Sequence, residues 1–177
     1  MDDIVSQAMA KWPDVPDCFG WLGLDSRGQW HMRDDRVQAL GSFQSGVPGA
    51  KGSVLRHDKL IEFIHRNYEA DPQGRWYFQN GPQRVYVELE CTPLVWRVRP
   101  DGGVCAHTGV EGELQSCLVD EHGHVYVHST QGLGLVHTLD VGVAADLIEQ
   151  GRWTPKDCVR AELPQRFGFA LSPAASL

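Results

Sequence analysis

The sequence predicts an α+β fold in which antiparallel β-sheets pack with two or three helices. Residues 75–104 are the strongest evidence, because apolar and polar side chains alternate there with the period of two typical of strands. Turn signals interrupt this pattern at 80–82 and 99–103, where Gly and Asn accept backbone angles that other residues avoid. Three further segments have the spacing of amphipathic helices. Together these observations favour meandering strands covered by helices.

The N-terminal part begins with an expected helix over 2–11, with Asp2 and Asp3 in its first turn. A hairpin over 21–32 follows, with Asp25 to Gly28 as its turn. Residues 33–53 have no periodicity and are rich in glycine, so we expect a flexible loop there, either a functional flap or a disordered insertion.

The remaining elements follow in order. A helix is expected over 57–68, a second D-x-x-G hairpin over 117–128, and a short strand over 132–136. A helix over 140–150 has Asp140 as its expected cap, and Gly151 follows its end. Residues 166–171 are interpreted as a final strand.

The two hairpins align with each other, Leu24-Asp25 with Val119-Asp120 and Gly28 with Gly123. This match predicts two imperfectly repeated halves of hairpin, helix and strands. We place the N-terminal half at 1–105, including the flexible loop 33–53, and the C-terminal half at 106–177. The two halves can also form one continuous domain.

Composition narrows the range of partners. The chain of 177 residues has a net charge of −7, which argues against nucleic acid or an anionic membrane as the main partner. The five cysteines are scattered and form no C-x-x-C pair, which argues against zinc-ribbon and thioredoxin sites. The N-terminus is acidic and no apolar run could span a bilayer, so we expect a cytoplasmic protein.

A set of short motifs runs along the chain: Trp12-Pro13 with Cys18 and Gly20, Gly28-x-Trp30, the helix around Leu60 to Ile64, and Tyr77-Phe78 leading through Pro82 into Val85-x-Val87-x-Leu89-Glu90. Their order, over about residues 12 to 150, resembles uncharacterised Gram-negative bacterial families of domains of unknown function. The resemblance implies an α+β fold with repeated motifs and a role in ligand binding or signalling. It implies no catalytic residues.

The candidate ligand site is an aromatic and basic group near the second helix: Arg66, Tyr68, Trp76, Asn80 and Arg84, with Arg75 and Tyr77 beside them. Aromatic faces and guanidinium groups suit a small anionic or planar ligand. The same residues also suit ordinary packing of a helix on a sheet, which is the more frequent role of buried Trp and Tyr.

Three other groups of residues are weaker candidates for a functional site. His122 and His124 flank a turn glycine, but zinc needs three or four ligands. A cysteine nucleophile could be Cys105 or Cys18; Cys105 and His107 share a strand face, but no third group orients them. The Glu88 and Glu90 carboxylates fit a cross-strand pairing with arginines such as Arg97 and Arg99 better than acid–base catalysis.

We therefore predict a non-enzymatic cytoplasmic binding or regulatory module for a small molecule or a protein partner, with no cofactor. The alternative is a hydrolase that uses the histidine-rich hairpin with a metal or Cys105. A third possibility is a homo-oligomer that forms through an exposed sheet edge.

Overall fold

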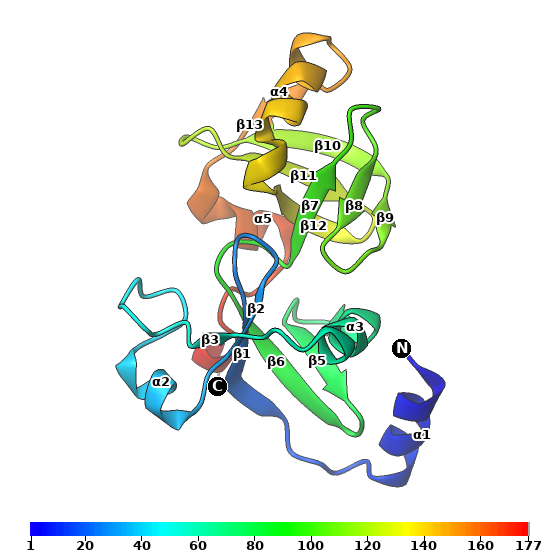
Figure 1. Ribbon diagram of the computed structural model, residues 1–177, viewed down its shortest axis with the longest axis vertical. Coiled ribbons are helices and arrows are strands. Elements are labelled where there is room, and N and C mark those ends of the chain that lie inside the picture. The colour runs from blue at the N-terminus through cyan, green and yellow to red at the C-terminus, as the bar shows by residue number, and fades with distance from the viewer. Residues whose placement is uncertain (177) are drawn as a thin grey trace. The chain divides into compact units, whose positions relative to one another are not determined.

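The structure is a computed structural model that describes residues 1–176, and it confirms the α+β class (Figure 1). It contains a six-stranded and a seven-stranded sheet, both mostly antiparallel. Contacts divide the chain into two compact units. The first holds residues 1–25, 29–90 and the chain from Phe169 onward, and the second holds 26–28 and 91–168. The chain therefore leaves the first unit at Glu90 and returns to it at Phe169.

The first unit is built on a sheet with the order β3-β2-β1-β6-β5-β4. Its core includes Leu24, Trp30, Ile64, Tyr86 and Leu89, all at most 1 % exposed. The elements are α1 (Asp3–Lys11), β1 (Cys18–Leu24), β2 (Trp30–Met32), α2 (Asp35–Leu40), β3 (Ser53–Val54), α3 (Asp58–Arg66), β4 (Tyr68–Ala70), β5 (Trp76–Asn80), β6 (Gln83–Leu89) and the 3₁₀ helix η3 (Pro173–Ser176).

The second unit is built on a sheet with the order β13-β10-β11-β12-β7-β8-β9. Trp96, Leu118, Tyr126, Val127 and Leu147 form its most buried core. The elements are β7 (Leu94–Val98), β8 (Val104–Ala106), β9 (Glu111–Gly112), β10 (Leu114–Val119), β11 (Val125–Ser129), β12 (Gly132–Val136), η1 (Thr138–Asp140), α4 (Val141–Glu149), β13 (Pro155–Asp157), η2 (Arg160–Glu162) and α5 (Leu163–Phe167).

The two sheets share one connectivity. Each contains two three-stranded meanders, and the first strand of one pairs in parallel with the last strand of the other, β1 with β6 and β7 with β12. The second sheet adds β13 in parallel beside β10. By strand order, β1–β2 corresponds to β7–β8, whereas the sequence aligned it with β10–β11. Both of those hairpins do form.

The D-x-x-G pattern marks a turn that this chain uses three times, at Asp25, Asp71 and Asp120. Each carboxylate accepts the backbone N–H four residues later, at 2.9 to 3.0 Å. The glycine of each turn has a φ between 74° and 83°, the left-handed conformation that such three-residue hairpin loops require. The alignment of the two hairpin sequences therefore reflects a turn type that both hairpins share.

The expected helices over 2–11, 57–68 and 140–150 are confirmed as α1, α3 and α4. The Nδ1 atom of His57 caps α3 by accepting the Leu60 N–H. Asp140 does not cap α4 with its side chain; its carboxylate binds the Arg97 guanidinium and the Val98 N–H.

Two regions differ from expectation. The stretch 33–53, expected to be a flexible loop, contains α2. The buried Arg33 side chain holds this stretch in place, because it donates hydrogen bonds to the carbonyls of Ala50, Gly20 and Gly41. The strand expected over 166–171 is wrong, because α5 runs to Phe167 and Gly168 ends it in a left-handed conformation. These short helices raise the number of α-helices within residues 1–176 to five.

Strand β6 is buried on both faces instead of one. Glu88 is 2 % exposed and accepts hydrogen bonds from Gln44 and Ala174, while Glu90 pairs with Lys51. The expected pairing of these carboxylates with Arg97 and Arg99 is therefore wrong. The reason is that the 33–53 stretch and the C-terminal tail cover the face that the alternation assigned to solvent.

Candidate functional site

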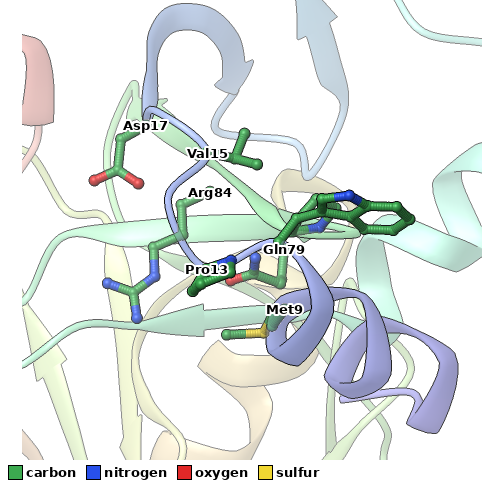
Figure 2. Close-up of a pocket in the computed structure, with 8 residues that line it drawn as sticks. Met9, Pro13, Val15, Asp17, Gln79 and Arg84 are labelled. Carbon is green, nitrogen blue, oxygen red and sulfur yellow. The ribbon is translucent and has the colours of Figure 1, made fainter.

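A groove of about 350 Å³ lies in the first unit, between the chain from α1 to β1 and the β5–β6 hairpin (Figure 2). Its volume is at the lower end of small-molecule sites, roughly 300 to 1,000 Å³. The lining combines a guanidinium, a carboxylate and an amide with apolar side chains: Met9, Trp12, Pro13, Val15, Asp17, Gln79, Pro82 and Arg84.

The hairpin places two polar groups of the groove side by side. Gln79 on β5 and Arg84 on β6 are direct partners in the antiparallel register. Directly opposed residues project from the same face of a sheet, so both side chains reach the groove. Gly81, with a φ of 57°, and Pro82 form the connection that sets this register. Figure 2 shows the Gln79 amide behind Pro13, among the groove-lining side chains.

Gln79 carries an acceptor that has no partner. Its side chain is fully buried, and its Nε2 donates to the Gly81 carbonyl at 2.9 Å. That bond fixes the orientation of the amide, since the Gly81 carbonyl needs a donor. Within residues 1–176 no group donates to the Gln79 Oε1 atom. A buried carbonyl without a donor costs roughly 1 to 3 kcal/mol, so this atom needs an explanation.

Arg84 supplies the positive charge. Its Cζ lies 4.8 Å from the centre of the Tyr77 ring, a cation–π contact that holds the side chain in place. Burial lowers the pKa of Arg84, but the Tyr86 hydroxyl and the nearby Tyr77 and Asp17 raise it above its usual value. The guanidinium therefore stays charged. In the described chain it forms no ion pair.

Asp17 supplies the negative charge. It is exposed, and its carboxylate helps to raise the pKa of both Arg84 and Arg75. Figure 2 shows Asp17 and Arg84 toward the same end of the groove. The two charges thus line one groove, and no salt bridge joins them in the described part of the chain.

Apart from Asp17, the wall that faces the hairpin is apolar and belongs to α1 and the segment after it. Trp12 is 51 % exposed, an unusual position for a large aromatic side chain. The start of α1 is tied to the end of α3, because the Asp2 N–H donates to Asn67 at 2.9 Å and the Asp2 carboxylate binds Arg66. This connection positions the wall.

The five residues predicted as a ligand site do not come together. Arg66 binds Asp2, whereas Tyr68 and Trp76 pack against each other with their ring centres 4.7 Å apart. Asn80 lines a separate apolar cleft of about 150 Å³ under α3. Arg84 is the member of the predicted set that lines the groove.

Sequence reasoning missed Gln79 and Asp17. A signal for Gln79 was present, because the turn at 80–82 was identified and a short connection places Gln79 opposite Arg84. Asp17 and Trp12 had no such signal, since a tertiary contact brings their segment to the hairpin.

The histidine-rich hairpin does not form a metal centre. His124 Nδ1 lies 3.1 Å from the Asp120 carboxylate, and the exposed His122 lies beside Glu121. The two imidazole rings are 6.1 Å apart. No group of three or more potential ligands is positioned for a metal ion in the part of the chain that the structure describes.

Cys105 lacks the features of a nucleophile. Burial and the Glu111 carboxylate raise the pKa of its thiol, which disfavours the reactive thiolate. Its Sγ lies 3.6 Å from the Ala106 carbonyl, while His107 Nδ1 accepts the Val95 N–H at 3.2 Å. The ring and the thiol are thus directed to different backbone groups.

Comparison with known proteins gave one family match. The DUF2944 family, described as "Protein of unknown function (DUF2946)", matches residues 1–174. No curated protein matches the chain. Between Met1 and Ser176, no helix is long and apolar enough to cross a membrane.

Two solved structures show a similarity to the chain. A DUF1285 family protein from Shewanella baltica OS155 has a TM-score of 0.47 at 12 % identity, covering 72 % of this chain and 91 % of that one. A DUF1285 family protein from Silicibacter pomeroyi DSS-3 has a TM-score of 0.49 at 14 % identity, covering 83 % of this chain and 85 % of that one. At these TM-scores the similarity supports no inference about function.

Proposed function

The chain belongs to the DUF2944 family, and we propose that it is a non-enzymatic module that binds a small molecule in the groove of its first unit. One observation carries the proposal: Gln79, whose buried Oε1 atom has no donor among the described residues, and Arg84 are register partners that line the same groove. Buried polar atoms in native proteins are nearly always paired. A bound ligand would supply the missing donor and an acceptor for Arg84.

The composition of the groove favours binding over catalysis. Its lining contains no Ser, Cys, His, Lys or Tyr, so it has no nucleophile with an adjacent base. The titratable groups are Asp17 and Arg84, and Arg84 cannot exchange a proton near neutral pH. A guanidinium, an amide and a carboxylate are typical of ligand recognition.

A cytoplasmic location is part of the proposal. All five cysteines (Cys18, Cys91, Cys105, Cys117 and Cys158) are free thiols. Free thiols are typical of proteins in a reducing compartment.

Thermal-shift screening tests the proposal. We would screen nucleotides, organic acids, amines and amino acids against the natural protein and against Arg84→Gln, which removes the charge that faces the groove. Arg56→Gln is the matched control, because Arg56 is exposed and lies outside the groove. The melting temperature of each unliganded variant shows whether it folds normally.

We expect at least one compound to raise the melting temperature of the natural protein and of Arg56→Gln but not of Arg84→Gln. If Arg84→Gln proves less stable without ligand, because it loses the Tyr77 contact, Gln79→Leu serves as the second groove variant. The proposal is wrong if no compound stabilises the natural protein, or if every stabilising compound acts equally on the groove variants.

A further inference from the structure

We infer that the groove takes a small zwitterion of the α-amino-acid type with an apolar side chain. The ligand carboxylate would bind Arg84, and its ammonium group would bind the Gln79 Oε1 atom and face Asp17. The inference rests on the proposed function, because it names the chemical class that the same groove would accept.

The Gln79 carbonyl determines the first ligand group. Its Oε1 atom can only accept hydrogen bonds, and its amide nitrogen is already committed to the Gly81 carbonyl. The ligand must therefore bring an N–H or O–H donor to this position. An ammonium group brings three N–H donors, and a charged donor forms a stronger bond than a neutral one.

The two charges determine the second group. Arg84 and Asp17 line the same groove with opposite charges, and neither forms an ion pair in the described residues. A simple anion would pair with Arg84 but meet the oxygen atoms of Asp17 and Gln79. A simple amine would satisfy those oxygens and be repelled by Arg84. A zwitterion satisfies all three groups at once.

The rest of the groove determines size and polarity. Its volume of about 350 Å³ holds a molecule of amino-acid size without difficulty. Met9, Trp12, Val15 and Pro82 offer apolar surface beside the charged groups. The half-exposed Trp12 indole would lose water when an apolar side chain packs against it.

A neutral planar amide, such as a pyrimidine base, also offers a donor next to an acceptor. It would pair with Gln79 and Arg84, but it has no positive charge for Asp17. The charge on Asp17 therefore favours the zwitterion, and the test below compares the two.

Isothermal titration calorimetry with matched compounds tests the inference. The probes are the apolar amino acids L-leucine, L-methionine, L-phenylalanine and L-tryptophan. Phenethylamine lacks the carboxylate of phenylalanine, 3-phenylpropanoate lacks its ammonium group, and uracil represents the neutral amide. We expect at least one amino acid to bind and each truncated compound to bind at least about tenfold more weakly, the loss typical of a charged hydrogen bond.

Three variants locate the binding. Asp17→Asn and Gln79→Leu should each weaken the best amino acid by about tenfold or more, whereas Asp14→Asn, an exposed control in the same segment, should not. The inference is overturned if the affinity is the same in all three variants, or if no amino acid binds.

The result also separates the inference from the proposed function. If phenylpropanoate, phenethylamine or uracil binds as tightly as the amino acids and depends on Arg84, the zwitterion is wrong and the groove is still a binding site. If the screen and the titrations both give no Arg84-dependent binding, both proposals are wrong.

Discussion

Gln79 and Arg84 face each other across the β5–β6 hairpin as direct register partners, and both line the same groove. One has a buried acceptor without a donor, and the other has a guanidinium without an ion pair in the described residues. The acceptor and the guanidinium are thus both available to a ligand. Both residues lie on paired strands, which hold the two groups in fixed positions.

Replacement of Gln79 separates a structural role from a ligand-binding role. Gln79→Leu loses one hydrogen bond, from Nε2 to the Gly81 carbonyl, and also removes the unpaired Oε1. These effects are similar in size and opposite in sign, so we expect the free energy of unfolding to change by less than about 1 kcal/mol. Urea denaturation measures it. A loss of several kcal/mol would show that the amide serves the fold.

The Asp120 carboxylate should be a strong contributor to the stability of the second unit. It is 6 % exposed and accepts the Tyr126 hydroxyl at 2.8 Å and the backbone N–H groups of His122 and His124. Asp120→Asn should therefore cost about 1 to 3 kcal/mol in urea denaturation. The control is Asp101→Asn at an exposed turn, and an equal loss there would contradict this assignment.

Acid should destabilise the protein through carboxylates that are stabilised when ionised. Burial raises the pKa of Asp71 and Asp120, but hydrogen bonds from Arg75 and Tyr86 to Asp71, and from Tyr126 and His124 to Asp120, hold both pKa values below the ordinary 3.8. For Asp140 the Arg97 guanidinium is the main cause of the lowered pKa.

A folded-state pKa below the unfolded one gives stability that is complete above the unfolded value and is lost as the pH falls through the folded value. We therefore expect these carboxylates to lower the urea midpoint below about pH 4. A separate loss should begin below about pH 6.5, because burial lowers the pKa of His65 and His128 and the unfolded chain takes up those protons first. Asp120→Asn should show a smaller fall than the natural protein. An identical pH profile for the two proteins would contradict this explanation.

A close approach between two strands requires a glycine at position 134. A Cβ atom at Gly134 on β12 would overlap the Trp96 indole of β7, which is fully buried and donates to the Val127 carbonyl. Gly134→Ala should therefore cost roughly 1 to 3 kcal/mol by overpacking. Gly142→Ala is the matched control in α4, where no atom lies within 4 Å, and it should be neutral or slightly stabilising. Equal effects would contradict the packing argument.

Much of the fold could be predicted because local patterns determine it. The D-x-x-G turns at Asp25 and Asp120 and the alternation around Val85 identified hairpins that the structure contains. The parallel pairing of β1 with β6 could not be predicted, since it joins strands about 65 residues apart through tertiary packing. The burial of Glu88 escaped prediction for the same reason, because residues distant in sequence cover it.

The candidate site could be predicted only in part. Arg84 was identified from its type and surroundings, and Gln79 could have been placed opposite it by counting from the turn. Tyr68 and Trp76 belong to an aromatic cluster with Trp30, where ring packing explains them. Sequence alone cannot separate an aromatic residue in a core from one in a ligand site, because both need the same apolar surface.

The most direct test is a nitrogen-15 NMR titration with L-phenylalanine that follows the Gln79 side-chain amide and the Arg84 Nε–H. The Gln79→Leu and Arg84→Gln spectra assign the two signals. We expect both to shift together and to saturate with the calorimetric affinity, since both side chains line the groove. If phenylalanine binds while both signals stay in place, or if it leaves the whole spectrum unchanged, the proposed site for this ligand is wrong.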